Sequence, residues 1–240
     1  MINYNEEYTR DNPSEEYKNL LNEYKDMHKS SSEMFNGRSL VRFAKPIRQL
    51  IRNYNCESLL DYGCGKGTLY TDNYNKVADS KSINKPLQEY WNIQKFTLYD
   101  PGEEKHSKLP KGLYDIVINT DVLEHVPEND LVWVIREIFN YSNQIVFLNI
   151  CCLPALKHFK DGRNVHVSLF SVEEWLQLIA RITENYPYLT VYVYADDKDA
   201  EDNYQTNSFK IIPRPTIIPL KMVEQKKDST KHKLGIQRWD

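Results

Sequence analysis

The stretch Leu59–Tyr70 reads LLDYGCGKGTLY and places three of the chain's eight glycines at alternate positions behind a short apolar run. A glycine cluster directly after a strand indicates that the backbone must approach a ligand closely. A strand, a glycine turn and a helix together form the nucleotide-binding crevice of a doubly wound sheet. This stretch therefore predicts an α/β fold and the place of a ligand site.

The rest of the chain alternates apolar runs with helical patterns. We expect strands over residues 58–62, 95–99, 114–119, 144–151, 188–194 and 209–212, and helices over 13–27, 39–54, 68–78, 128–141 and 171–185. Continuous apolar strands separated by helices predict a buried, mostly parallel sheet with helices on both faces. The last two strands have no helix between them, so an antiparallel edge hairpin is expected.

Local signals mark two helix starts. Ser39 and Ser171 are predicted N-caps, and Glu174 completes a capping box with Ser171. Pro46 predicts a kink or a late start for the helix that follows Ser39. We expect three parts: a helical lid or extension over residues 1–54, a Rossmann-like domain over 55–213, and an extended tail over 214–240.

Composition limits the function classes. The 240 residues carry 31 Lys and Arg against 34 Asp and Glu, a formal charge of −3, which gives no electrostatic case for sequence-independent nucleic-acid binding. No apolar run reaches the length of a membrane span. The four cysteines are Cys56, Cys64, Cys151 and Cys152, and no cluster has metal-ligand spacing. We therefore expect a cytoplasmic protein with reduced thiols, no metal, and no membrane or nucleic-acid partner.

Two cofactor classes compete for the glycine loop. Dinucleotide sites carry GxGxxG, with the pyrophosphate on the helix N-terminus. Here the spacing is GxGxG, position 68 is threonine, and Asp61 precedes the first glycine by two residues. A carboxylate there would repel a pyrophosphate and suit an ammonium group. The loop therefore favours a nucleoside that carries an amino acid over a dinucleotide.

Three segments in order resemble class I S-adenosylmethionine-dependent methyltransferases that act on small molecules: LLDYGCGKG, FTLYDP and YDIVINTDVLEHVPE. The resemblance implies a sheet of the seven-stranded type. It implies that Asp61 and the backbone of residues 62–65 hold the methionine part of S-adenosyl-L-methionine, that Asp100 accepts both ribose hydroxyls, and that Pro101 lies against the adenine. The implied cofactor-binding residues are Asp61, Tyr62, Gly63, Cys64, Gly65, Asp100, Pro101, Thr120, Asp121, Val122 and Leu123.

The sequence departs from the family pattern on both sides of Asp100. An extra stretch, DSKSINKPLQEYWNIQ, precedes the strand that ends at Asp100. The segment between Asp100 and Tyr114 leaves little room for the helix and third strand that the family normally has there. No residue can therefore be assigned to the family's third, adenine-contacting motif.

Methyl transfer needs alignment of the acceptor and exclusion of water, and a base helps when the acceptor must lose a proton. His125 and His166 are the candidate bases, and His28 is a candidate to close over the pocket. The alternative for Glu124 and His125 is that they only order the loop before the following helix. Lys66, inside the glycine loop, has no assigned role.

The predicted function is S-adenosylmethionine-dependent methyl transfer to a small-molecule acceptor. Enzymes that methylate nucleic-acid bases carry either an Asn/Asp-Pro-Pro-aromatic turn or a Pro-Cys nucleophile at the strand end where this chain has NTDV. Two alternatives remain: a non-catalytic module that binds S-adenosylmethionine, and an NAD-dependent oxidoreductase.

Overall fold

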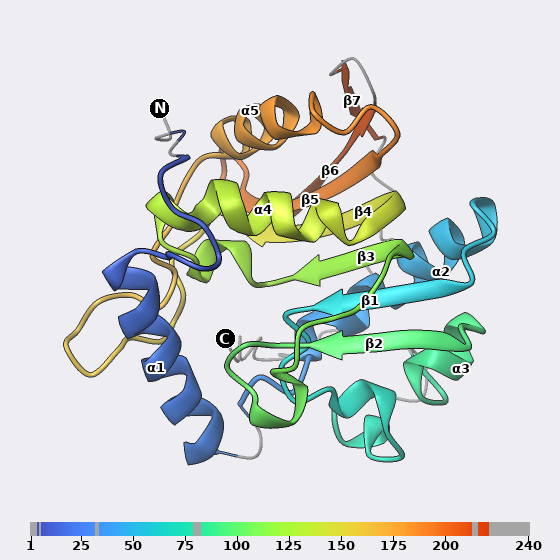
Figure 1. Cartoon of the computed structure of the whole chain (residues 1–240), viewed down its shortest axis with the longest axis horizontal. Coiled ribbons are helices and arrows are strands. Elements are labelled where there is room, and N and C mark those ends of the chain that lie inside the picture. The colour runs from blue at the N-terminus through green and yellow to red at the C-terminus, as the bar shows by residue number, and fades with distance from the viewer. Residues whose placement is uncertain (1–3, 5, 32–33, 79–82, 213–215, 221–240) are drawn as a thin grey trace.

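A computed structural model describes residues 4, 6–31, 34–78, 83–212 and 216–220. Its centre is a seven-stranded sheet in the order β2-β1-β3-β4-β5-β6-β7 (Figure 1). The strands are β1 Ser58–Tyr62, β2 Lys95–Tyr99, β3 Tyr114–Thr120, β4 Ser142–Cys151, β5 Thr190–Lys198, β6 Tyr204–Ile212 and β7 Thr216–Pro219. The predicted α/β class, mostly parallel with an antiparallel edge hairpin and an N-terminal helix, is confirmed.

The sheet has a switch point in its middle. β1 pairs in parallel with β2 on one side and with β3 on the other, and the order then continues outward through β4 and β5. β6 and β7 complete the far edge in antiparallel pairs. Ligands of open α/β sheets bind outside the carboxyl ends of the strands where the strand order reverses, which here lies between β1 and β3.

Successive side chains of the strands enter two different cores, as the twofold period of a strand requires. Leu60, Val117 and Val146 belong to the core under α4 (Leu131–Asn140) and α5 (Val172–Thr183). Their neighbours Leu59 and Ile116 belong to the core under α2 (Ala44–Asn53) and α3 (Leu87–Trp91). Both faces of the sheet are thus buried, which explains why its strands are apolar without alternation.

Two predicted helices differ in the structure. Residues 68–78 form two 3-10 turns, Thr68–Tyr70 and Tyr74–Lys76, in place of an α-helix. The Thr71 hydroxyl donates to the Thr68 carbonyl, a side-chain contact that competes with helical bonding. The second helix begins late, at Ala44, after a 3-10 turn over Arg38–Phe43, and the residues at the two N-cap positions are Gly37 and Phe43 instead of Ser39. Pro46 lies in its first turn, where proline is tolerated.

The segment between β2 and β3 holds only the 3-10 turn Glu104–His106, so no strand or α-helix is present between Asp100 and Tyr114. This agrees with the short spacing in the sequence. The space beside the carboxyl end of β2 is taken instead by α1 (Glu15–Ser30), which lies beyond the carboxyl ends of β1–β3 (Figure 1).

The chain ahead of α1 is fixed to α4. Asp130 accepts hydrogen bonds from the backbone N–H of Ser14 at 3.0 Å and from the Trp133 indole at 2.7 Å. The Arg10 guanidinium pairs with Glu137. On its other side α1 packs against the loop after β4, where Leu20 joins Phe159 and Val165 in a small separate core. We call α1 and residues 153–170 the cap.

The tail predicted from residue 214 includes β7, which pairs with β6 and extends the sheet; residues 221–240 lie outside the described part of the chain. Among the described helices none combines the length and apolar character that crossing a bilayer demands.

The capping box of α5 is present as predicted, and it offers a simple stability test. The Ser171 hydroxyl accepts from the Glu174 backbone N–H, and the Glu174 carboxylate accepts from the Ser171 backbone N–H. Ser171→Ala is expected to lower the free energy of unfolding by about 1 kcal/mol, measured by urea denaturation. Ser171→Asp retains a capping oxygen and should lose much less stability. Equal losses of stability in the two variants would contradict the role of Ser171 as the N-cap of α5.

Candidate functional site

A cavity opens at the carboxyl ends of β1, β2 and β3, directly under the cap. Its floor is the glycine loop and the strand ends, and its roof is α1 and the loop over residues 35–40. It lies at the switch point of the sheet, where the fold predicts a ligand. The predicted residues that line it are Asp61, Tyr62, Gly63, Cys64, Gly65, Asp100, Pro101, Thr120, Asp121, Val122 and His125.

Two predicted residues do not line this cavity. Leu123 is fully buried in the core beneath α4. His166 is also buried, but its ring lies 4.7 Å from that of His125, centroid to centroid. The loop after β3 thus lines the cavity on both sides of Leu123, whose own side chain belongs to the core.

The three glycines of the loop all adopt positive φ, which other residues avoid. A Cβ on Gly63 would lie 2.3 Å from Val122 Cγ2, and a Cβ on Gly65 would lie 2.2 Å from the Phe35 carbonyl oxygen. That carbonyl also accepts from the Lys66 backbone N–H at 2.8 Å. Gly63 is therefore approached closely by Val122, and Gly65 by the backbone of Phe35. The contacts of Phe35 join the loop over residues 35–40 to the glycine loop.

Asp61 is the most unusual carboxylate of the cavity. It is 2 % exposed, and its Oδ2 accepts a hydrogen bond from the Tyr70 hydroxyl at 2.8 Å. Its Oδ1 is buried and has no hydrogen-bond partner among the described residues. Burial raises the pKa of Asp61 to about 7, with the Tyr70 hydrogen bond opposing the shift and the negative charge of Asp100 adding to it. A buried carboxylate oxygen without a donor is costly, and a cationic donor would satisfy it.

Asp100 joins the glycine loop to the turn that follows β2. Its Oδ2 accepts from the Gly65 backbone N–H at 2.9 Å, and its Oδ1 accepts from the Gly102 backbone N–H at 2.8 Å. Each carboxylate oxygen retains capacity for a further donor. Asp100 therefore both shapes the loop and presents acceptors to the cavity.

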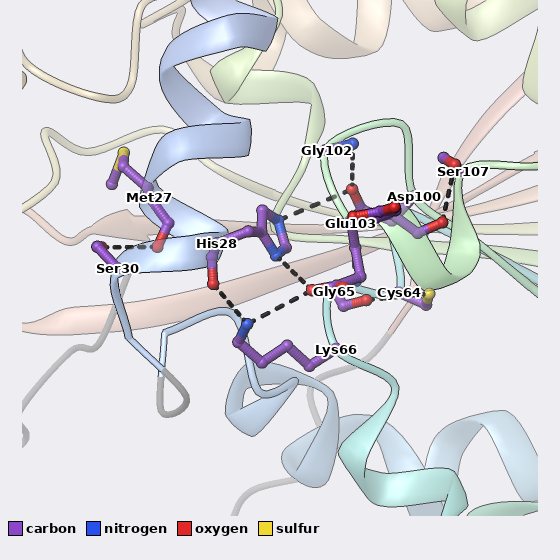
Figure 2. A network of polar contacts seen from close by, with 11 residues as sticks. Met27, His28, Ser30, Cys64, Gly65, Lys66, Asp100, Gly102, Glu103 and Ser107 are labelled. Atoms are coloured by element: carbon purple, nitrogen blue, oxygen red, sulfur yellow. Dashed lines mark hydrogen bonds and ion pairs between the residues drawn. The ribbon is translucent and has the colours of Figure 1, made fainter.

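The role of Lys66 becomes clear in the structure. Its ammonium donates to the His28 carbonyl at 2.8 Å, at the end of α1, and contacts the Glu103 carboxylate at 3.4 Å (Figure 2). A lysine at a helix C-terminus satisfies carbonyls that lack helical partners. Lys66 thus ties the cap to the glycine loop.

His125 lies in the cavity wall as a neutral imidazole. Burial, together with neighbouring His166, lowers its pKa to about 4. Its Nδ1 lies 3.0 Å from the Val165 carbonyl oxygen and 2.8 Å from the Tyr24 hydroxyl. A carbonyl only accepts, so we assign the proton to Nδ1, which leaves the lone pair on Nε2.

The protonation of His125 gives a prediction that does not depend on any ligand. Its imidazole is expected to remain neutral, with the proton on Nδ1, as the pH falls to about 5. A histidine-selective ¹⁵N NMR titration reads both the tautomer and the pKa. The exposed ordinary value is 6.5, so titration of His125 near pH 6.5 would contradict the buried, neutral assignment.

Glu124 has a structural part in the same loop. It is fully buried, and its Oε1 accepts from the Cys151 backbone N–H at 2.7 Å. Burial and the charge of Asp121 raise the pKa of Glu124 well above its usual range. The expected alternative, that this residue orders the loop before α4, fits these contacts. Cys64 lines the cavity, but burial raises the pKa of its thiol, so it remains protonated.

Three contributors were missed in the sequence: Tyr24, Phe35 and Tyr70. Tyr70 holds Asp61, Tyr24 holds His125, and Phe35 covers Gly65. Each was open to interpretation as a core aromatic residue, because only the fold brings it to the site. No strand-end position or motif spacing marks these residues.

No group of metal-binding side chains occurs in the ranges that the structure describes. Searches with models of known protein families, with curated proteins and with solved structures find no match to this chain. The functional assignment therefore depends on the chemistry of the cavity itself.

Proposed function

We propose that the protein transfers a methyl group from S-adenosyl-L-methionine to a small-molecule acceptor. The observation that carries this proposal is Asp61, whose buried Oδ1 lacks a donor in the wall of a cavity built from the glycine loop. An amino-acid ammonium supplies such a donor, with charge assistance. Asp100 presents acceptors for a ribose at the neighbouring strand end.

The geometry disfavours a dinucleotide. A pyrophosphate binds where backbone N–H groups and the helix dipole converge at a helix N-terminus. The glycine loop is followed by the three-residue 3-10 turn Thr68–Tyr70, which provides no such terminus. The buried Asp61 adds negative potential at the same place. An NAD-dependent oxidoreductase therefore lacks support for the phosphates of its cofactor.

S-Adenosylmethionine, when bound, supplies an activated methyl group for in-line displacement. The chain's contribution is to bind, orient and exclude water. Asp61 would bind the ammonium, and Asp100 the ribose. α1 and the loop over residues 35–40 would cover the bound molecules. Such a roof fits an acceptor of small size.

His125 is the residue placed best to take a proton from an acceptor hydroxyl or amine. It lines the cavity, it is neutral, and its Nδ1–H is fixed by the Val165 carbonyl, so that Nε2 is the basic atom. His166 would be a positioning residue, because it packs edge-on against His125 and its Nδ1 lies 2.6 Å from the Leu153 carbonyl. His125 Nε2 or water would take the proton that the acceptor loses on receiving the methyl group, and S-adenosylhomocysteine would be the second product.

Incubation of the full chain with a small-molecule cell extract and cofactor labelled in its methyl group tests the proposal. We expect the label to appear in a small product with the wild-type protein and not with Asp100→Ala. Binding of the cofactor without any labelled product from extracts of several sources would favour a non-catalytic binding module.

A further inference from the structure

His28 lies where α1 meets the part of the cavity that Asp100 lines. It occupies the last turn of α1, is 8 % exposed and lines the cavity. Its Nδ1 lies 3.0 Å from Glu103 Oε2, and its Nε2 faces Asp100 Oδ1 at 3.8 Å (Figure 2).

The hydrogen-bond partner of His28 Nδ1 determines whether His28 Nε2 donates or accepts a hydrogen bond. Partial burial acts to raise the pKa of Glu103, but the ammonium of Lys66 and the hydrogen bond from His28 outweigh it and lower the pKa. Glu103 is thus a carboxylate that only accepts, so the neutral His28 ring carries its proton on Nδ1. Its Nε2 then bears a lone pair and acts as an acceptor.

Two acceptors therefore face each other across a gap that no hydrogen bond spans. The separation of 3.8 Å between Nε2 and Asp100 Oδ1 is too long for a hydrogen bond, and with the ring neutral neither atom has a proton to offer. A ligand with two neighbouring hydroxyl donors satisfies both atoms at once. The vicinal diol of a ribose has this property.

Local packing holds His28 at this place. Its ring lies 4.5 Å from that of Phe35, centroid to centroid, and Lys66 fixes its carbonyl. A Cβ on Gly102 would lie 3.2 Å from His28 Cδ2, so glycine at that position permits the approach. The short segment between β2 and β3 leaves the space that α1 fills.

We propose that His28 is a specificity residue that accepts one hydroxyl of the ribose diol through Nε2, while Asp100 accepts the other. The proposal depends on the proposed function for the identity of the nucleoside. It differs from the expectation that Asp100 receives both hydroxyls, and it assigns to the cap a direct part in distinguishing ribose from deoxyribose.

Deoxy analogues test the proposal in a thermodynamic cycle that combines a substitution in the protein with removal of a ligand hydroxyl. Isothermal titration calorimetry would compare S-adenosylhomocysteine with its 2′-deoxy and 3′-deoxy analogues on four forms of the full chain: wild type, His28→Asn, His28→Gln and His158→Asn. Asparagine keeps a donor near Glu103 but has no atom at the Nε2 position, whereas glutamine returns a carbonyl oxygen to that region. His158 is exposed, does not line the cavity and serves as the matched control.

In wild type, loss of the hydroxyl that reaches His28 should weaken binding by about fivefold to tenfold. In His28→Asn that analogue and the ribose form should bind equally, and His28→Gln should restore part of the difference. His158→Asn should behave as wild type. Circular dichroism melting of each form checks that it is folded.

The contrary results are distinct. In the first, wild type binds S-adenosylhomocysteine, and His28→Asn weakens the binding of S-adenosylhomocysteine and of both deoxy analogues by the same factor. In that case His28 only holds α1 in place, and the proposed specificity role is wrong. If wild type binds neither S-adenosylhomocysteine nor adenosine, the proposed function fails together with this assignment.

Discussion

Asp100→Ala is expected to weaken binding of S-adenosylhomocysteine by about 100-fold or more. The substitution removes a charged acceptor for the ribose. It also removes the two bonds that the carboxylate makes with the backbone N–H groups of Gly65 and Gly102. The loop and the turn after β2 lose their common anchor, so the loss exceeds that of one ligand contact. Isothermal titration calorimetry measures it.

Two variants control this experiment. Asp100→Asn keeps one oxygen acceptor and should lie between wild type and the alanine variant. Glu104→Ala removes an exposed carboxylate four residues along the chain and should bind normally. Equal affinity of wild type and Asp100→Ala would show that the cavity does not hold a ribose at this strand end.

Asp61→Asn is expected to change binding and stability in opposite directions. Removing the charge should weaken the binding of S-adenosylhomocysteine by roughly 10-fold to 100-fold, because a charge-assisted hydrogen bond to the ligand ammonium is lost. The same change relieves the burial of a carboxylate that is 2 % exposed. The free energy of unfolding at pH 8 should rise by roughly 1–3 kcal/mol.

The pH dependence follows from the raised pKa of Asp61, about 7 in the fold against an ordinary 3.8. Between these values the folded chain holds a proton that the unfolded chain has released, so this group makes stability fall as the pH rises. The contribution is complete below the unfolded pKa and lost once the pH passes the folded one. The advantage of Asp61→Asn should therefore be small at pH 4 and largest above pH 7.

Methylthioadenosine, which lacks the amino acid, is the matched ligand control. Its affinity should be nearly the same for wild type and Asp61→Asn, because it has no ammonium to lose. Equal weakening of both ligands would mean that the substitution distorts the cavity, and a fall in stability at pH 8 would contradict the burial cost of the carboxylate.

The sheet was predictable from sequence because burial on both faces makes its strands continuous apolar runs. The predicted bounds of β1 and β2 agree with the structure. The helix expected after Gly67 was wrong, since Thr71 and its neighbours form turns through side-chain contacts. β7 was missed because its four exposed residues carry no core pattern.

The site was predictable where its residues follow strand ends. Asp61, the glycines, Asp100 and Asp121 are all placed by the parallel sheet, whose carboxyl ends share one edge. Residues of α1 and of the loop over residues 35–40 follow no strand end, and only His28 among them was a candidate from the sequence. His28, Tyr24 and Phe35 reach the cavity only because α1 fills the space left by the short segment between β2 and β3.

Calorimetric titration of the full chain with S-adenosylhomocysteine, and separately with NAD⁺, tests the central claim most directly. We predict saturable binding of S-adenosylhomocysteine with a micromolar Kd at pH 8. Binding should be weaker at pH 6, because Asp61 gains a proton, and NAD⁺ should not bind. Binding of NAD⁺ without S-adenosylhomocysteine would contradict the account.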